Sequence, residues 1–383
     1  MNRSLLCGDL TGFGKPVRSG ATLKSKRTRT VMEDMRLIRS LLVGVVLLAC
    51  GVSSALAQEY HVYVAAESDD EVAHVRFDGE TATVEETIAV GTMPTETEGA
   101  HGMTVSPDGQ HWFVSIAHGK PYGRVVKYAT GTNEKIGAAD VGMFPATMAI
   151  SEATGLLYVV NFNLHGEMEP STVSVVDPAA MIEVDQVETG PMPHGSRLSP
   201  DGRRQYSVAM MNGTLYEIDT ATLDVTRSLQ TGDADSKPTW VQPHPTEPLA
   251  YVAHNGADEV VEVNLDTWTL TRRFATGTGT KPYNLDVTPD GQHLVVTYKG
   301  SGETGIWDLD AGESVARLRN SRTVSHGVVI SPDSRYAFVT AEGVGGEPGA
   351  VDVFDLTTRE RVASVDVGKQ AGGIAFWRMT TGS

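Results

Sequence analysis

Three histidines recur at the same place in a repeated sequence pattern. His101, His194 and His326 are each followed by glycine, and each lies five residues before the serine of a Ser-Pro-Asp turn. Residues that share a position in a repeat are expected to share a position in the fold. Imidazole nitrogen binds zinc and copper, so three histidines brought together predict a metal site that leaves a coordination position for water or substrate.

Three further histidines are secondary candidates for ligands. His118, His165 and His254 each follow a predicted second strand, and we expect them in loops on the same side of the fold as the first three. Methionines fall in or near loops on that side as well, and thioether sulfur favours Cu(I). These methionines are Met93, Met143, Met168, Met192, Met210 and Met211.

The cysteines narrow the choice of metal and cofactor. Cys7 and Cys50 are the only two, and both fall in, or at the edge of, a segment that we expect to be removed. The mature chain would therefore lack the thiols needed for disulfides, thiolate metal sites, cysteine nucleophiles and covalently attached haem. A histidine site without thiolates favours copper first and zinc next.

A repeated turn positions the histidines. Ser106–Gly109 reads Ser-Pro-Asp-Gly, and it recurs intact or altered along the chain. Proline and glycine at these positions favour a tight turn between two short alternating segments. Two more such segments complete each unit, and none has helical periodicity. The units are marked at residues 106, 151, 199, 244, 288, 331 and 377, so the spacing is 43 to 48 residues.

Four short strands in a unit of this length are typical of a propeller blade. Seven units predict an all-β, seven-bladed β-propeller over residues 58–383. The mature chain would begin with a second-strand segment, 61–65, and end with a first-strand segment, 372–377. We therefore expect the C-terminal strand to pair with the N-terminal blade and close the ring.

The repeat resembles that of a known family. The Tyr-Val strand (Leu157–Asn161), the Val-x-Val-x-Asp strand (Val173–Asp177) and the Ser-Pro-Asp-Gly turn are similar to the YVTN-type propeller repeat. Related propellers occur in surface-layer proteins, bacterial lactonases and cytochrome d1. The resemblance covers about residues 60–383, and it implies a site on the top face, where the first strands begin.

The first 57 residues have the features of an over-extended start followed by a secretory signal peptide. Arg36 and Arg39 are basic, Leu41–Ala49 is apolar, and Ala55–Ala57 is a small-x-small cleavage site. The apolar run is too short to span a bilayer. We therefore expect a periplasmic or secreted protein, with lipidation at Cys50 as the alternative.

The charge of the mature chain limits its partners. Residues 1–57 contain nine of the 31 basic and three of the 48 acidic residues, so the remainder has a net charge of −23. Such a surface repels nucleic acid and anionic lipid. We expect a monomer that binds a metal ion or small ligand and docks a periplasmic protein partner.

Three functions remain open at this point. The first is a binding protein that holds copper or zinc at His101, His194 and His326. The second is a metal-assisted hydrolase or lyase of the lactonase type. The third is a protein-interaction scaffold without a metal, whose histidines are paired with backbone. The sequence contains no nucleophile elbow, P-loop, dinucleotide fingerprint or His-Glu-x-x-His motif, so it assigns no catalytic residue.

Overall fold

The computed structural model describes residues 58–93 and 95–382. The predicted signal peptide and Cys50 lie outside this range. The regular structure of the described part consists of 28 β-strands. Within the same part of the chain, no helix is long and apolar enough to cross a membrane.

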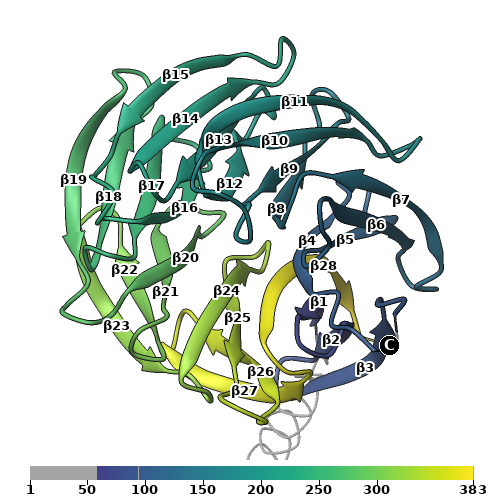
Figure 1. The fold of residues 1–383 in the computed structure, drawn as a ribbon. Helices are drawn as coiled ribbons and strands as arrows, with labels where there is room; N and C mark the ends of the chain where they lie inside the picture. Colours follow the sequence, from purple (N-terminus) through teal and green to yellow (C-terminus); the bar gives the residue numbers. More distant parts are fainter. Residues whose placement is uncertain (1–57, 94, 383) are drawn as a thin grey trace, which may run out of the picture. The chain divides into compact units, whose positions relative to one another are not determined.

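The strands form seven sheets of four, arranged in a ring (Figure 1). The prediction of a seven-bladed β-propeller is therefore confirmed. Each blade is an antiparallel sheet whose first-named strand below is innermost, against the innermost strands of the adjacent blades.

The strands of the first four blades, from the axis outward, are as follows. The N-terminal blade contains β28 (Ala371–Thr381), β1 (Gln58–Ala66), β2 (Glu71–Phe77) and β3 (Ala82–Ala89). The next contains β4 (Ala100–Val105), β5 (His111–Ile116), β6 (Gly123–Ala129) and β7 (Lys135–Val141). It is followed by β8 (Pro145–Ile150), β9 (Leu157–Asn161), β10 (Pro170–Asp177) and β11 (Ile182–Pro191). The fourth contains β12 (Pro193–Leu198), β13 (Arg204–Ala209), β14 (Thr214–Asp219) and β15 (Val225–Gln230).

The last three blades follow the same order. They contain β16 (Pro238–Pro243), β17 (Leu249–His254), β18 (Glu259–Asn264) and β19 (Thr269–Ala275); β20 (Pro282–Val287), β21 (His293–Tyr298), β22 (Glu303–Asp308) and β23 (Glu313–Arg319); and β24 (Val324–Ile330), β25 (Tyr336–Glu342), β26 (Gly349–Asp355) and β27 (Glu360–Val367).

The repeated turn joins the innermost strand of a blade to its second strand. In the first copy the Ser106 N–H donates to the carbonyl of His111 (2.8 Å), and the His111 N–H donates to the Ser106 hydroxyl oxygen (3.0 Å). Gly109 has φ +67°, which glycine adopts without the steric cost that a side chain brings. The turn therefore fixes the register at the lower end of each innermost strand.

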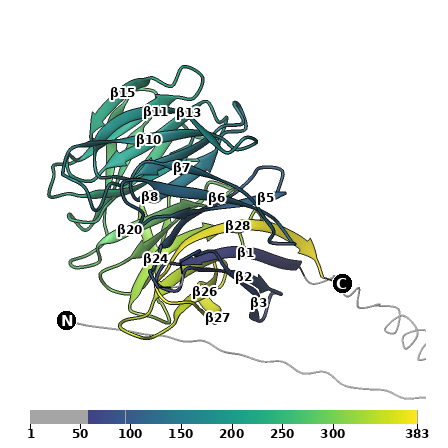
Figure 2. The same ribbon diagram turned by 45° about the vertical axis from the view of Figure 1, so that its right-hand side comes forward.

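The chain closes the ring with its two ends. Strand β28 pairs antiparallel with β1, with Tyr63 opposite Ala375 and Val64 opposite Ile374. Figure 2 shows β28 lying along β1. The predicted closure is confirmed: the last strand is the innermost strand of the blade that the first strands build.

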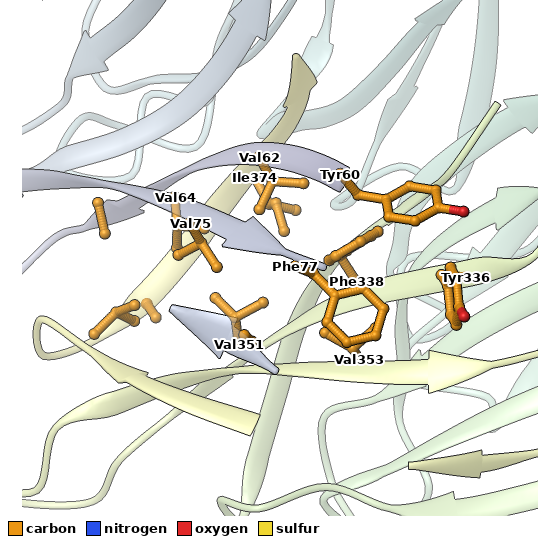
Figure 3. Close-up of a cluster of buried hydrophobic side chains, with 14 residues drawn as sticks. Tyr60, Val62, Val64, Val75, Phe77, Tyr336, Phe338, Val351, Val353 and Ile374 are labelled. Atoms are coloured by element: carbon orange, nitrogen blue, oxygen red, sulfur yellow. The ribbon is translucent and has the colours of Figure 1, made fainter. Parts of the chain in front are cut away.

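A buried apolar cluster joins this closing blade to the last one. Tyr60 and Phe77 pack edge-on against Tyr336, with ring centroids 5.1 and 5.0 Å apart (Figure 3). Phe338 and Val351 belong to the same cluster and are fully buried. The alternation of apolar and polar residues in these strands thus places their apolar side chains between neighbouring blades.

Candidate functional site

Each innermost strand places one residue near its start beside the central axis. This is the second residue of the strand in six blades and the third in β24. His101 is contributed by β4, His194 by β12 and His326 by β24. The ring centroid of His101 is 6.2 Å from that of His194 and 6.0 Å from that of His326. The structure thus brings together three histidines that are 93 and 132 residues apart in the chain. The other four blades contribute Ala146, Thr239, Tyr283 and Gly372 at this position.

The glycine after each histidine allows the blades to approach closely at the axis. A Cβ atom added to Gly102 would lie 1.9 Å from the carbonyl oxygen of Ala146, and one added to Gly195 would lie 2.4 Å from that of Thr239. At Gly327 the added Cβ would lie 2.6 Å from the carbonyl oxygen of Gly372. These obstacles are backbone atoms of the next blade. A residue with a Cβ atom after the histidine would therefore push the two blades apart.

Hydroxyl groups of adjacent blades fix the backbone of two of the histidines. The Thr147 hydroxyl, on a neighbouring innermost strand, donates to the carbonyl of His194 at 2.7 Å. The Thr297 hydroxyl, on β21, donates to the carbonyl of His326 at 2.8 Å. These bonds cross from one blade to the next, so the imidazoles are held by the ring rather than by their own blades alone.

His194 is held as a neutral imidazole with a defined tautomer. Its Nδ1 lies 3.2 Å from the carbonyl oxygen of Thr239, which can only accept, so Nδ1 carries the proton and donates. Its Nε2 then accepts from the hydroxyl of Tyr283, 2.9 Å away. Burial, with smaller contributions from His101 and Lys299, lowers the pKa of His194 to about 3. At neutral pH the ring therefore presents an Nε2 lone pair.

His101 is tied to a buried carboxylate. Its Nδ1 lies 2.7 Å from Glu67 Oε2, and Nε2 of His118 lies 2.9 Å from Glu67 Oε1. Burial raises the pKa of Glu67, but His101 and His118 together outweigh it and lower that pKa to about 2. Glu67 is therefore an ionised acceptor, and His101 donates to it from Nδ1. This carboxylate–histidine pair is the arrangement that orients many metal ligands.

His326 is the least constrained of the three. Its Nδ1 is buried and has no hydrogen-bond partner among the described residues. Its Nε2 lies 3.8 Å from Glu342 Oε1, and its ring centroid lies 4.6 Å from that of Tyr283. Burial, reinforced by Lys299, lowers the pKa of His326 well below its usual value. A buried nitrogen without a partner is costly, so this atom is available to a ligand.

The secondary candidates have different surroundings. His118 and His165 lie in loops, with their ring centroids 5.9 Å apart and both against Phe144. The prediction that His254 lies in a loop is wrong, because β17 continues to it and buries it fully. Its Nδ1 and Nε2 lie 3.3 Å from Glu259 Oε1 and 3.1 Å from the hydroxyl of Thr231.

The loop methionines divide into packed and exposed residues. Met192 is buried with Phe144 and Phe162, and Met210 and Met211 pack against the same cluster. Met93 and Met168 are exposed. Two methionines that the sequence analysis did not single out, Met103 and Met148, line the axial cavity.

The axial cavity has a volume of about 40 Å³. The three histidines line it together with Arg197, Trp240 and Asn284. Sequence reasoning missed Glu67 and these last three residues as site residues. The sequence did contain a pattern that could have identified Arg197. It lies three residues after His194 on the same innermost strand, and equivalent residues of the other innermost strands lie at the same level of the axis.

Among the described residues, no set of three or more His, Cys, Asp or Glu side chains is already arranged to hold a metal ion. The hydroxyl of Tyr283 also occupies the Nε2 lone pair of His194. A metal at the axis would have to displace that hydroxyl. The arrangement is a cluster of imidazoles around a small cavity, with one phenol and one carboxylate hydrogen-bonded to two of the rings.

No model of a known protein family matches the chain, and no curated protein matches it. Solved structures are similar in fold. Hydrazine synthase of Kuenenia stuttgartiensis aligns with a TM-score of 0.58 and 22% identity, over 70% of this chain and 80% of that one. A protein from Lactobacillus plantarum aligns with a TM-score of 0.70 and 16% identity, over 84% and 100% of the two chains. These likenesses support the propeller fold of the chain.

Proposed function

We propose that this protein is an exported, YVTN-type propeller that binds a copper or zinc ion on its axis, through His101, His194 and His326. The observation that supports the proposal most is the fixed tautomer at two of the three rings. Nδ1 of His101 donates to Glu67 and Nδ1 of His194 donates to Thr239, which leaves Nε2 of each ring as the metal-binding atom.

The ionisation of the cluster suits a metal ion. Metal binds the neutral imidazole, and burial keeps His194 and His326 neutral at physiological pH. Glu67 remains an anion beside the site and offsets part of the positive charge. Binding requires one rearrangement, in which the Tyr283 hydroxyl leaves Nε2 of His194.

The cavity favours copper over zinc. Met103 and Met148 are among the residues that line it, and thioether sulfur is a ligand for Cu(I) but a poor one for zinc. The site would serve storage or delivery of the ion, with the top-face loops docking a protein partner. The net charge of −23 on residues 58–383 suits a cationic partner.

Metal analysis of periplasmic protein tests the proposal. Wild-type protein, purified without chelator, is expected to contain about one equivalent of copper or zinc by mass spectrometry of the elements. The triple variant His101→Ala/His194→Ala/His326→Ala is expected to lose it. The control His293→Ala, on β21 away from the axial cluster, should keep it. Unchanged metal content in the triple variant rejects the proposal.

A hydrolase or lyase of the lactonase type is the second candidate. The observation that favours it is the 2.9 Å hydrogen bond between the Tyr283 hydroxyl and His194 Nε2, because a phenol and an imidazole can exchange a proton during catalysis. Turnover of simple lactones that Tyr283→Phe reduces, with metal content retained, would support the enzyme. Absence of turnover in metal-loaded protein counts against it.

A further inference from the structure

A second ring of side chains lies below the histidines. Each innermost strand contributes another residue to the channel three positions further on, and on β12 this residue is Arg197. The corresponding residues on β16 and β20 are Gln242 and Asp286. All three are partly exposed although the strands around them are buried, as expected of side chains that line a channel. We propose that Arg197, together with Trp240 and Asn284, binds a small carboxylate or inorganic oxyanion in the axial cavity.

Arg197 is a cation without an anionic partner in contact. Among the described residues, the carboxylate of Asp286 is near enough to favour the charged guanidinium, but no carboxylate lies within ion-pair distance of it. Its Nη1 donates to the carbonyl of Ser196 at 3.0 Å, and the group lies 4.8 Å from the ring centroid of Trp240. Asp286 uses its oxygens to accept from the N–H groups of Val287 (2.9 Å) and Ile330 (3.1 Å). The remaining guanidinium donors are free for a ligand, and a planar guanidinium matches a carboxylate or oxyanion.

Two more polar side chains in the lining lack partners. Trp240 is 7% exposed and Asn284 is 3% exposed, and both line the same cavity as Arg197. Neither Nε1 of Trp240 nor Oδ1 of Asn284 has a hydrogen-bond partner among the described residues. The indole N–H is only a donor, and the two ends of an amide can exchange by a flip. An anion would therefore find donors from Arg197, Trp240 and Asn284.

The size of the cavity limits the ligand. A cavity needs roughly 10–15 Å³ to hold one water molecule. The axial cavity of about 40 Å³ therefore holds about three waters, or one anion of similar size. Formate, acetate and bicarbonate fit this limit. A haem, a nucleotide or a sugar does not. In the lining of this cavity Arg197 is the one side chain with a permanent charge, and its sign selects an anion.

The proposal is independent of the metal. It rests on Arg197, Trp240 and Asn284, whereas the metal proposal rests on the three histidines. Binding of sodium formate and sodium acetate to metal-free, chelator-treated protein separates the two. Calorimetry at low ionic strength should show one formate site in this metal-free wild-type protein.

Substitution of the donors gives the decisive comparison. Arg197→Gln is expected to weaken formate binding at least tenfold. Trp240→Phe, which keeps an aromatic side chain but removes the indole N–H, is expected to weaken it severalfold. The control Arg203→Gln removes an exposed arginine and should bind as the wild type does. If Arg197→Gln does not fold, Trp240→Phe alone carries the test. Formate binding that these variants leave unchanged, or no binding to the wild type, overturns the proposal.

Discussion

At the residue scale, the axial cluster depends on pairs of residues rather than on single ones. Histidine supplies the imidazole, and the glycine that follows it lets the next blade come close enough to complete the cluster. A Cβ atom at Gly195 would lie 2.4 Å from both the carbonyl oxygen of Thr239 and the Cα of Trp240. Neither backbone atom can move without moving its blade.

Gly195→Ala is therefore expected to destabilise the protein by about 1–3 kcal/mol, the range found when a packed interior receives an extra carbon. The measurement is urea unfolding at neutral pH. Gly346→Ala is the matched control, because a Cβ there meets nothing within 4 Å, and its free energy of unfolding should equal that of the wild type. Equal stability of both variants would show that the inner strands are not packed as described.

The repeat predicted His101, His194 and His326 because equivalent positions in a symmetric fold meet at the axis. It did not predict Glu67, because that residue follows β1 in a blade built from both ends of the chain, where the repeat is hardest to align. It also did not predict that His254 ends strand β17 and is buried. A histidine that ends a strand and one that begins a loop differ by a single residue, and burial decides between them.

At the element scale, strands β1 and β2 each contribute one histidine to a pair that lies away from the axis. Nδ1 of His61 lies 3.0 Å from Nε2 of His74 on β2, and both rings pack against Trp377 of β28. Burial, followed by the effect of His74, lowers the pKa of His61 to about 4. The strand that closes the ring is therefore most stable when this pair is uncharged.

Acid should loosen this closing strand. His61 has a lower pKa when folded than when unfolded, so between about pH 6.5 and 4 the unfolded chain binds more protons, and stability falls as pH falls. At pH 5, which is about 1.5 units below the pKa of the unfolded chain, His61 lowers the free energy of unfolding by about 2 kcal/mol, at 1.36 kcal/mol per unit. His61→Gln should reduce the difference in unfolding free energy between pH 7 and pH 5 by about that amount.

Urea unfolding at both pH values measures this effect. His293→Gln serves as the control, because it removes a histidine from β21 without touching the closing blade. The explanation fails if His61→Gln keeps the full acid dependence of the wild type.

At the scale of the whole molecule, the ring is closed by hydrogen bonds between the two ends of the chain. Seven turn repeats and two complementary end segments were enough to predict this architecture, because each blade can bury its apolar faces only between two others. The cavity at the centre was not predictable in the same way. Its volume and unpartnered atoms depend on side chains from seven blades, whose packing no local pattern encodes.

Removal of residues 371–383 should open the ring. It would leave β1 with an unpaired edge and uncover Val62 and Val64, which face β28. We expect this truncated chain to lose cooperative thermal unfolding in calorimetry and to associate with itself. A control that lacks only residues 382–383 should unfold as the intact chain does. A monomeric, cooperatively folded protein without β28 would contradict this account of closure.

The proposed metal ion would lie on the axis between three blades. Anomalous diffraction from crystals of metal-loaded protein tests this placement most directly, with data on both sides of the copper or zinc absorption edge. The account predicts a single strong peak about 2.0–2.1 Å from Nε2 of His101 and His194, with His326 as the third ligand. A peak away from the axis, or an axis without a peak in crystals that bind metal elsewhere, would contradict it.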